Sequence, residues 1–149
     1  MLTPDFAAYA GRIHVRFKKP RSGAHVQSLM QDFMSRTAIG CGEAGASLIG
    51  HIKCIVEADN GGYLVCSATD SSGRVRCRGS LKDGTCDIDL VLNVLLYGMD
   101  RERIEEVVAR SSKDLMESEE SKVEIEDLDV EEHDHDHEHG EDDDEHDHD

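Results

Sequence analysis

Six histidines near the C-terminus have the residue type and spacing for metal chemistry. The last seventeen residues, HDHDHEHGEDDDEHDHD, hold six of the chain's nine histidines and ten acidic residues. Neutral imidazole suits Ni(II), Zn(II), Co(II) and Cu(II), and neighbouring carboxylates can neutralise charge or add ligands. The candidate metal ligands are His133, His135, His137, His139, His146 and His148.

The same segment also fits an acidic solubilising or interaction tail, because runs of like charge usually mark such tails. An acidic tail needs no histidine, however, and here histidine alternates with acid. The segment has no apolar residue to offset an ordering entropy of roughly 1–2 kcal/mol per residue, so we expect it to be disordered. Metal sites on such a segment should be labile and poorly selective, which suits storage and delivery.

The distribution of charge predicts where this tail begins. Residues 1–116 carry 15 Lys and Arg against 14 Asp and Glu, whereas residues 117–149 carry one Lys and 19 acids. We therefore predict an α+β domain over 1–116, long enough to bury one core, and a disordered acidic His-rich tail over 117–149.

Within the body, apolar and polar residues alternate over 12–19, which predicts a strand. Ser22 can cap a following helix that ends in a glycine-rich connection near 40–45. Three further segments with strand character are separated by DNGG and DSSG, which favour tight turns, and together predict a three-stranded meander. The segments are 47–59, 62–70 and 73–81.

Apolar residues recur at helical spacing over 87–98, and a second helix is predicted over 98–116 with Asp100 as its cap. The expected fold is α+β: a small antiparallel sheet of about four strands, covered on one face by two or three helices.

Alternation places Cys54, Cys66 and Cys77 on one face of the meander. A two-residue loop at 71–72 would set Cys66 opposite Cys77, and a three-residue loop at 59–61 would set Cys54 opposite Cys66. The row could bind a soft or borderline metal through thiolates, or pack as small apolar residues in the core. The chain shows no secretory signal and has an odd number of cysteines, so all five are expected to be reduced.

The opposite face of the predicted sheet carries a positive stripe. It could hold nucleic acid, a nucleotide phosphate or an acidic partner, and the chain's own tail is the nearest acidic segment. Aromatic residues make up only 4% of the chain, which argues against nucleic acid and favours a solvated or protein-docking face. The stripe comprises His14, Arg16, Lys53, Arg74, Arg76 and Arg78.

Motifs of several enzyme classes are absent from the sequence, which contains no GxxxxGK[ST], GxGxxG, GxSxG or HExxH. We therefore expect a non-enzymatic protein. The enzyme alternative would use an exposed thiol, for which Cys41 and Cys86 are the candidates. No apolar run approaches the length of a membrane span, and we expect a cytoplasmic protein.

The tail resembles the His/Asp-rich tails and loops of nickel, cobalt and zinc accessory proteins, including hydrogenase and urease maturation factors and CobW-type GTPases. More weakly, GHIKCIVEADNGGYLVCSATD followed by LNVLLYGMDRERIEEVV is similar to the region after the GTPase domain of CobW/HypB-like proteins. The chain lacks their P-loop and their C-x-C-C metal motif. The resemblance implies a metallochaperone that serves a maturation factor or GTPase and carries over no catalytic residue.

The function predicted from the sequence is storage or delivery of Ni, Co or Zn to a protein partner, with the tail histidines as ligands and Cys54, Cys66 and Cys77 as further candidates. The alternative is an interaction subunit that docks through its basic sheet face and is regulated by its acidic tail. A homodimer is compatible with either reading.

Overall fold

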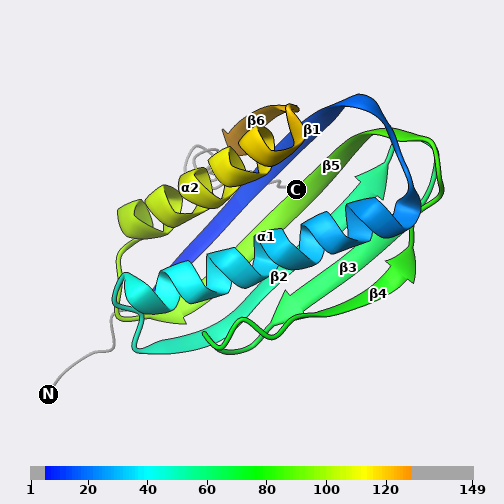
Figure 1. Ribbon diagram of the computed structural model, residues 1–149. Helices are drawn as coiled ribbons and strands as arrows, with labels where there is room; N and C mark the ends of the chain where they lie inside the picture. Colours follow the sequence, from blue (N-terminus) through cyan, green and yellow to red (C-terminus); the bar gives the residue numbers. More distant parts are fainter. Residues whose placement is uncertain (1–5, 129–149) are drawn as a thin grey trace, which may run out of the picture.

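The computed structural model of this chain describes residues 6–128, which form one antiparallel sheet with two helices on the same face (Figure 1). The six tail histidines therefore lie outside the described residues. The strands are β1 (Phe6–Arg21), β2 (Leu48–Ala58), β3 (Tyr63–Ala68), β4 (Arg76–Ser80), β5 (Thr85–Tyr97) and β6 (Lys122–Asp127). The helices are α1 (Gly23–Glu43) and α2 (Arg101–Glu119).

The sheet has six strands in the order β4-β3-β2-β5-β1-β6. The long strands β1, β2 and β5 form its centre, and β4 and β6 form its two edges. The fold is α+β as predicted, but the expectation of about four strands is wrong. Two segments account for the difference.

The first is β5, where the sequence predicted a helix. Along this strand Ile88, Leu90, Leu92, Val94 and Leu96 are buried, and the residues between them are partly or fully exposed. The same apolar run also fits a helical stripe, because leucine and valine occupy positions compatible with both periods. Pairing with β1 on one side and β2 on the other decides in favour of the strand.

The second is β6, which lies in the segment predicted to be a disordered tail. Six residues from Lys122 to Asp127 pair antiparallel with β1, and Ile125 lies opposite Ile13. The predicted boundary at Met116 falls inside α2. Residues 122–127 thus form a strand. Pairing with the edge of β1 and packing of the apolar residues Val123 and Ile125 stabilise it by more than the repulsion between neighbouring acids destabilises it.

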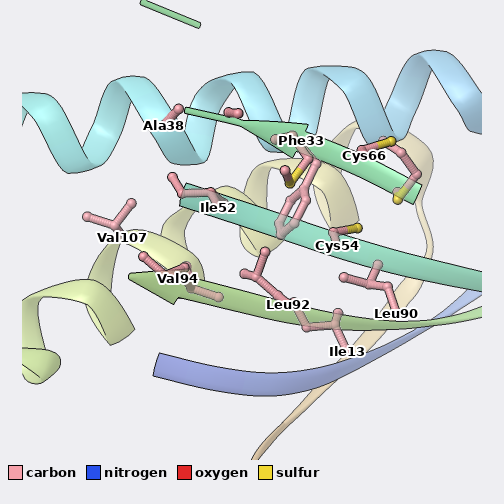
Figure 2. Close-up of a cluster of buried hydrophobic side chains, with 14 of the residues drawn as sticks. Ile13, Phe33, Ala38, Ile52, Cys54, Cys66, Leu90, Leu92, Val94 and Val107 are labelled. Atoms are coloured by element: carbon pink, nitrogen blue, oxygen red, sulfur yellow. The ribbon is translucent and has the colours of Figure 1, made fainter. Parts of the chain in front are cut away.

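The core lies between the sheet and the two helices. Figure 2 shows Phe33 reaching down from α1 toward the sheet, above Cys54 of β2 and Leu92 of β5. All three side chains are at most 2% exposed. Burial of such side chains, at about 1.5–3 kcal/mol each, supplies the driving force that holds the helices on this face.

Helix α1 ends at Glu43, within the predicted connection and before Gly45, whose φ is +119°, but it continues through Gly40 and Gly42. A Cβ on Gly40 would lie 2.9 Å from Cγ1 of Val107 in α2. Glycine here permits the close approach of the two helices rather than ending the first one. Neither helix among residues 6–128 is long and apolar enough to cross a membrane.

Candidate functional site

The predicted row of cysteines exists, and its register is as predicted. Cys54 lies opposite Cys66, and Cys66 lies opposite Cys77. The chain between β3 and β4 is longer than the predicted two-residue loop, although the register is the same. Cys66 and Cys77 form a disulfide, so the expectation that all five cysteines are reduced does not hold in this structure. Directly opposed residues on antiparallel strands bring their Cβ atoms within reach of such a bond.

The disulfide limits what the row can do with metal. Cys54 remains a free thiol but is fully buried, and burial raises its pKa to about 12. Within residues 6–128, no group of three or more His, Cys, Asp or Glu side chains could hold a metal ion. The row becomes a set of candidate ligands only when the disulfide is reduced and the thiols ionise.

The two other cysteines differ from their predicted environments. Cys41 was expected to be exposed in a loop, but it is buried in α1, and burial raises the pKa of its thiol to about 11. Cys86 was expected at a helix start, but it lies in β5, with Sγ 3.8 Å from the Gly84 carbonyl oxygen. No helix dipole therefore acts on Cys86, and Cys41 is not an accessible nucleophile.

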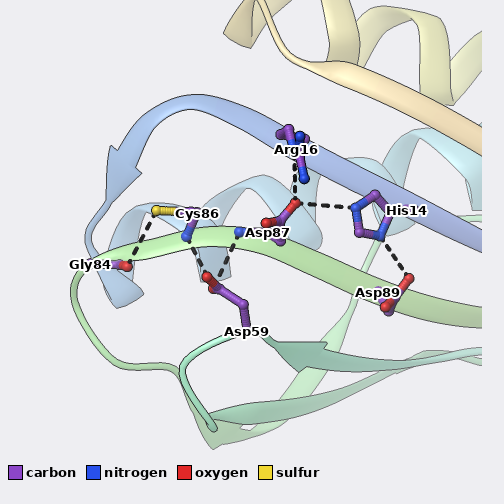
Figure 3. A network of polar contacts seen from close by, with 7 residues as sticks. All are labelled: His14, Arg16, Asp59, Gly84, Cys86, Asp87 and Asp89. Atoms are coloured by element: carbon purple, nitrogen blue, oxygen red, sulfur yellow. Dashed lines mark hydrogen bonds and ion pairs between the residues drawn. The ribbon is translucent and has the colours of Figure 1, made fainter.

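Within residues 6–128 the second face of the sheet carries no helix, and we call it the open face. One end of this face holds a cluster of charges centred on His14 (Figure 3). Its Nδ1 lies 2.9 Å from an Asp89 carboxylate oxygen and its Nε2 lies 3.1 Å from Asp87, which also accepts a hydrogen bond from Nε of Arg16 at 3.3 Å. Hydrogen bonding to Asp89, followed by that carboxylate's charge and by Asp87, raises the pKa of His14.

This arrangement favours a structural ion cluster over a metal site. An imidazole with a carboxylate on each nitrogen donates from both when it is protonated, which leaves no lone pair for a metal. Sequence reasoning missed the cluster because it predicted a helix over 87–98, the segment that contains Asp87 and Asp89. The spacing of two acids at i and i+2, matching that of His14 and Arg16, could have indicated the strand pairing.

The predicted positive stripe is therefore divided. His14 and Arg16 belong to the ion cluster, whereas four cations of β1, β2 and β4 on the open face, and also Lys122 of β6, form no ion pair among the described residues. These four, which we call the basic cluster, are Arg12, Lys53, Arg76 and Arg78, and all are exposed. Arg74 lies outside β4, in the connection that precedes it.

Apolar side chains share the open face with the basic cluster. Phe6, Leu48, Ile55 and Tyr63 are between 42% and 60% exposed. Phe6 lies beside Tyr97 across the strand pair, with ring centroids 5.3 Å apart. Ile55 lies in the row of Arg12 and Arg78, and Tyr63 lies in the next row, whereas Phe6 and Leu48 lie at the other end of the face. Exposed apolar residues next to unpaired cations are typical of a protein-docking surface.

No family model and no curated protein matches this chain. Solved structures do match it, although at low sequence identity. A hydantoinase/carbamoylase family amidase from Burkholderia ambifaria matches with a TM-score of 0.51 and 12% identity, over 85% of this chain and 29% of the amidase. A putative aminohydrolase from methicillin-resistant Staphylococcus aureus matches with a TM-score of 0.46 and 11% identity, over 85% of this chain and 32% of that protein.

The likeness to the amidase concerns the fold alone. This chain spans less than a third of the length of either matched protein. The predicted resemblance to nickel, cobalt and zinc accessory proteins finds no counterpart in these comparisons and stays a prediction.

Proposed function

We propose that this protein is a cytoplasmic, non-enzymatic accessory protein that binds Ni, Co or Zn through its C-terminal tail and stores the metal or delivers it to a maturation partner such as a CobW-like GTPase. The observation that carries the proposal is the alternation of histidine with acid from His133 to His148. It places many imidazole and carboxylate ligands within reach of one ion.

The folded body contributes the surface at which metal would be handed over. The open face combines the exposed apolar residue Ile55 with the basic cluster, and the two helices cover the opposite face. These features also support the second candidate, an interaction subunit that docks a protein through the basic face without handling metal. Amidase activity is not proposed, because the structural likeness concerns less than a third of the amidase.

Metal titration of three proteins tests the proposal. The full chain is compared with a chain ending at Leu128, which keeps β6, and with a full-length variant in which all six tail histidines are changed to Gln. Calorimetry or equilibrium dialysis with Ni(II), Zn(II) and Co(II) gives the stoichiometry. We expect the truncated chain to lose most of the uptake and the Gln variant to lose it although its carboxylates remain.

The pH dependence and the redox state give two further readouts. Uptake by the full chain should weaken below about pH 6, because protonated imidazole does not ligate metal. Equal uptake by the full chain and the truncated chain would contradict the proposal. Uptake that the truncated chain gains only after reduction would assign the metal to the cysteines instead.

A further inference from the structure

The point at which the described chain ends lies at the edge of the open face. The backbone N–H of Leu128 donates to the Ala10 carbonyl at 3.0 Å, directly after β6 has paired with β1. Residues 129–149 therefore start from the β6 edge of the sheet, level with Ala10.

The strand register shows what lies across the sheet from this point. The row that contains Ala10 continues through Asn93, Lys53 and Ser67 to Arg76. The next row contains Arg12, Val91, Ile55, Val65 and Arg78. The basic cluster thus occupies the row level with the start of the tail and the adjacent row on the side of His14.

The acids of β2 and β5 on this face lie farther away. Glu57 and Asp89 are in the row after the basic cluster, together with His14, and Asp87 is one row beyond. Asp87 and Asp89 already hold His14 and Arg16. Glu126 of β6 is cross-strand from Arg12 but forms no ion pair with it among the described residues. The cations of the basic cluster are therefore available to an added anion.

The remaining chain has the charge and the length to be that anion. Residues 129–149 contain thirteen acids and no Lys or Arg. Six strands at about 4.8 Å spacing place β4 roughly 24 Å from β6, whereas 21 extended residues reach up to about 70 Å. The segment can cross the whole sheet without displacing β6.

We propose that residues 129–149 dock on the open face of their own chain, with carboxylates on Arg12, Lys53, Arg76 and Arg78. This docking does not depend on metal. Where the tail also binds metal, as proposed above, each divalent ion removes two negative charges and weakens the contact. The tail would then release the surface that a partner uses.

Amide NMR spectra of the full chain and of the chain ending at Leu128, recorded at low salt with EDTA, test the docking. Shift differences should concentrate in β1, β2 and β4 at the two basic rows. They should shrink when NaCl rises to about 0.5 M, where the Debye length falls to about 4 Å. EDTA keeps this result independent of whether the tail binds metal.

Two charge-reversal variants, made in the full chain and in the chain ending at Leu128, provide the matched comparison. R76E/R78E removes two cations of the basic cluster, and R110E/K113E makes the same change in net charge at exposed sites of α2. A synthetic 129–149 peptide added to the truncated chain should bind at least about tenfold more weakly to the first variant and unchanged to the second.

Three outcomes would overturn the proposal. One is identical spectra for the full and truncated chains beyond the residues next to the cut. Another is an equal loss of peptide binding in both variants, which would show a nonspecific charge effect. The third is concentration-dependent dimerisation of the truncated chain with shifts on the open face, which would assign that face to a second copy of the protein.

Discussion

Removing β6 should destabilise the body even though the strand lies in the acidic part of the sequence. The perturbation is a chain ending at Ser121, compared with a chain ending at Leu128. Both lack residues 129–149, so the difference between them isolates β6. It pairs with β1 over six residues and places Val123 and Ile125 on the helix-bearing side of the sheet.

The expected loss follows from the side chains. Val123 is partly buried and Ile125 is 43% exposed, so at half of full burial they contribute about 1 kcal/mol each. The ion pair between Asp127 and Arg101, both about one-third exposed, adds about 1 kcal/mol at most. The net hydrogen-bond gain of the ladder roughly offsets the entropy of ordering six residues. The free energy of unfolding should therefore fall by about 2–3 kcal/mol.

Urea denaturation followed by circular dichroism measures this loss. For a slope of about 1–3 kcal/mol/M, the midpoint should fall by about 1–3 M. The D127N variant of the longer chain should lose no more than the part of the stability that comes from the ion pair with Arg101. Midpoints that agree within about 0.3 M would refute the reasoning and would return the domain boundary to the end of α2.

Two other predictions concern the thiols and His14. In the native protein Cys86 should react first with a thiol reagent, because burial raises the pKa of Cys41 to about 11 and that of Cys54 to about 12. Alkylation in denaturant should label three cysteines without reductant and five with it. Rapid labelling of Cys54 in the native protein would contradict its burial. NMR titration should give His14 a pKa above 6.5 that falls in the D89N variant. Because the pKa of His14 is raised in the folded protein, its contribution to stability is present below pH 6.5 and is lost as the pH rises through the folded pKa. A measured His14 pKa at or below 6.5 would contradict the bridging geometry.

Part of the fold could be predicted because, in some segments, the spacing of the apolar residues fits either a strand or a helix but not both. The strand character of 12–19, the helix capped by Ser22 and the meander that follows were all predicted correctly. So was the register that aligns Cys54, Cys66 and Cys77. Turn-forming residues fix the hairpins locally, and alternation then fixes which side chains share a face.

The candidate sites were less predictable, because they depend on contacts between distant segments. Asp87 pairs with His14 across 73 residues, and this contact required residues 85–97 to form a strand. The burial of Cys41 required α1 to continue through its glycines against α2. Neither contact can be derived from local spacing.

The sequence by itself determined the chemistry at the end of the chain: many imidazoles and carboxylates, no apolar residue, and therefore a segment whose function rests on ligation and charge. Only the tertiary structure decided what that segment is attached to. Pairing with β1 makes residues 122–127 an edge strand, and because β5 pairs between β1 and β2 instead of forming a helix, one sheet face has no helix from the described part of the chain. The physical reason is that an ambiguous apolar run adopts the conformation whose partners are available, and those partners are distant in sequence.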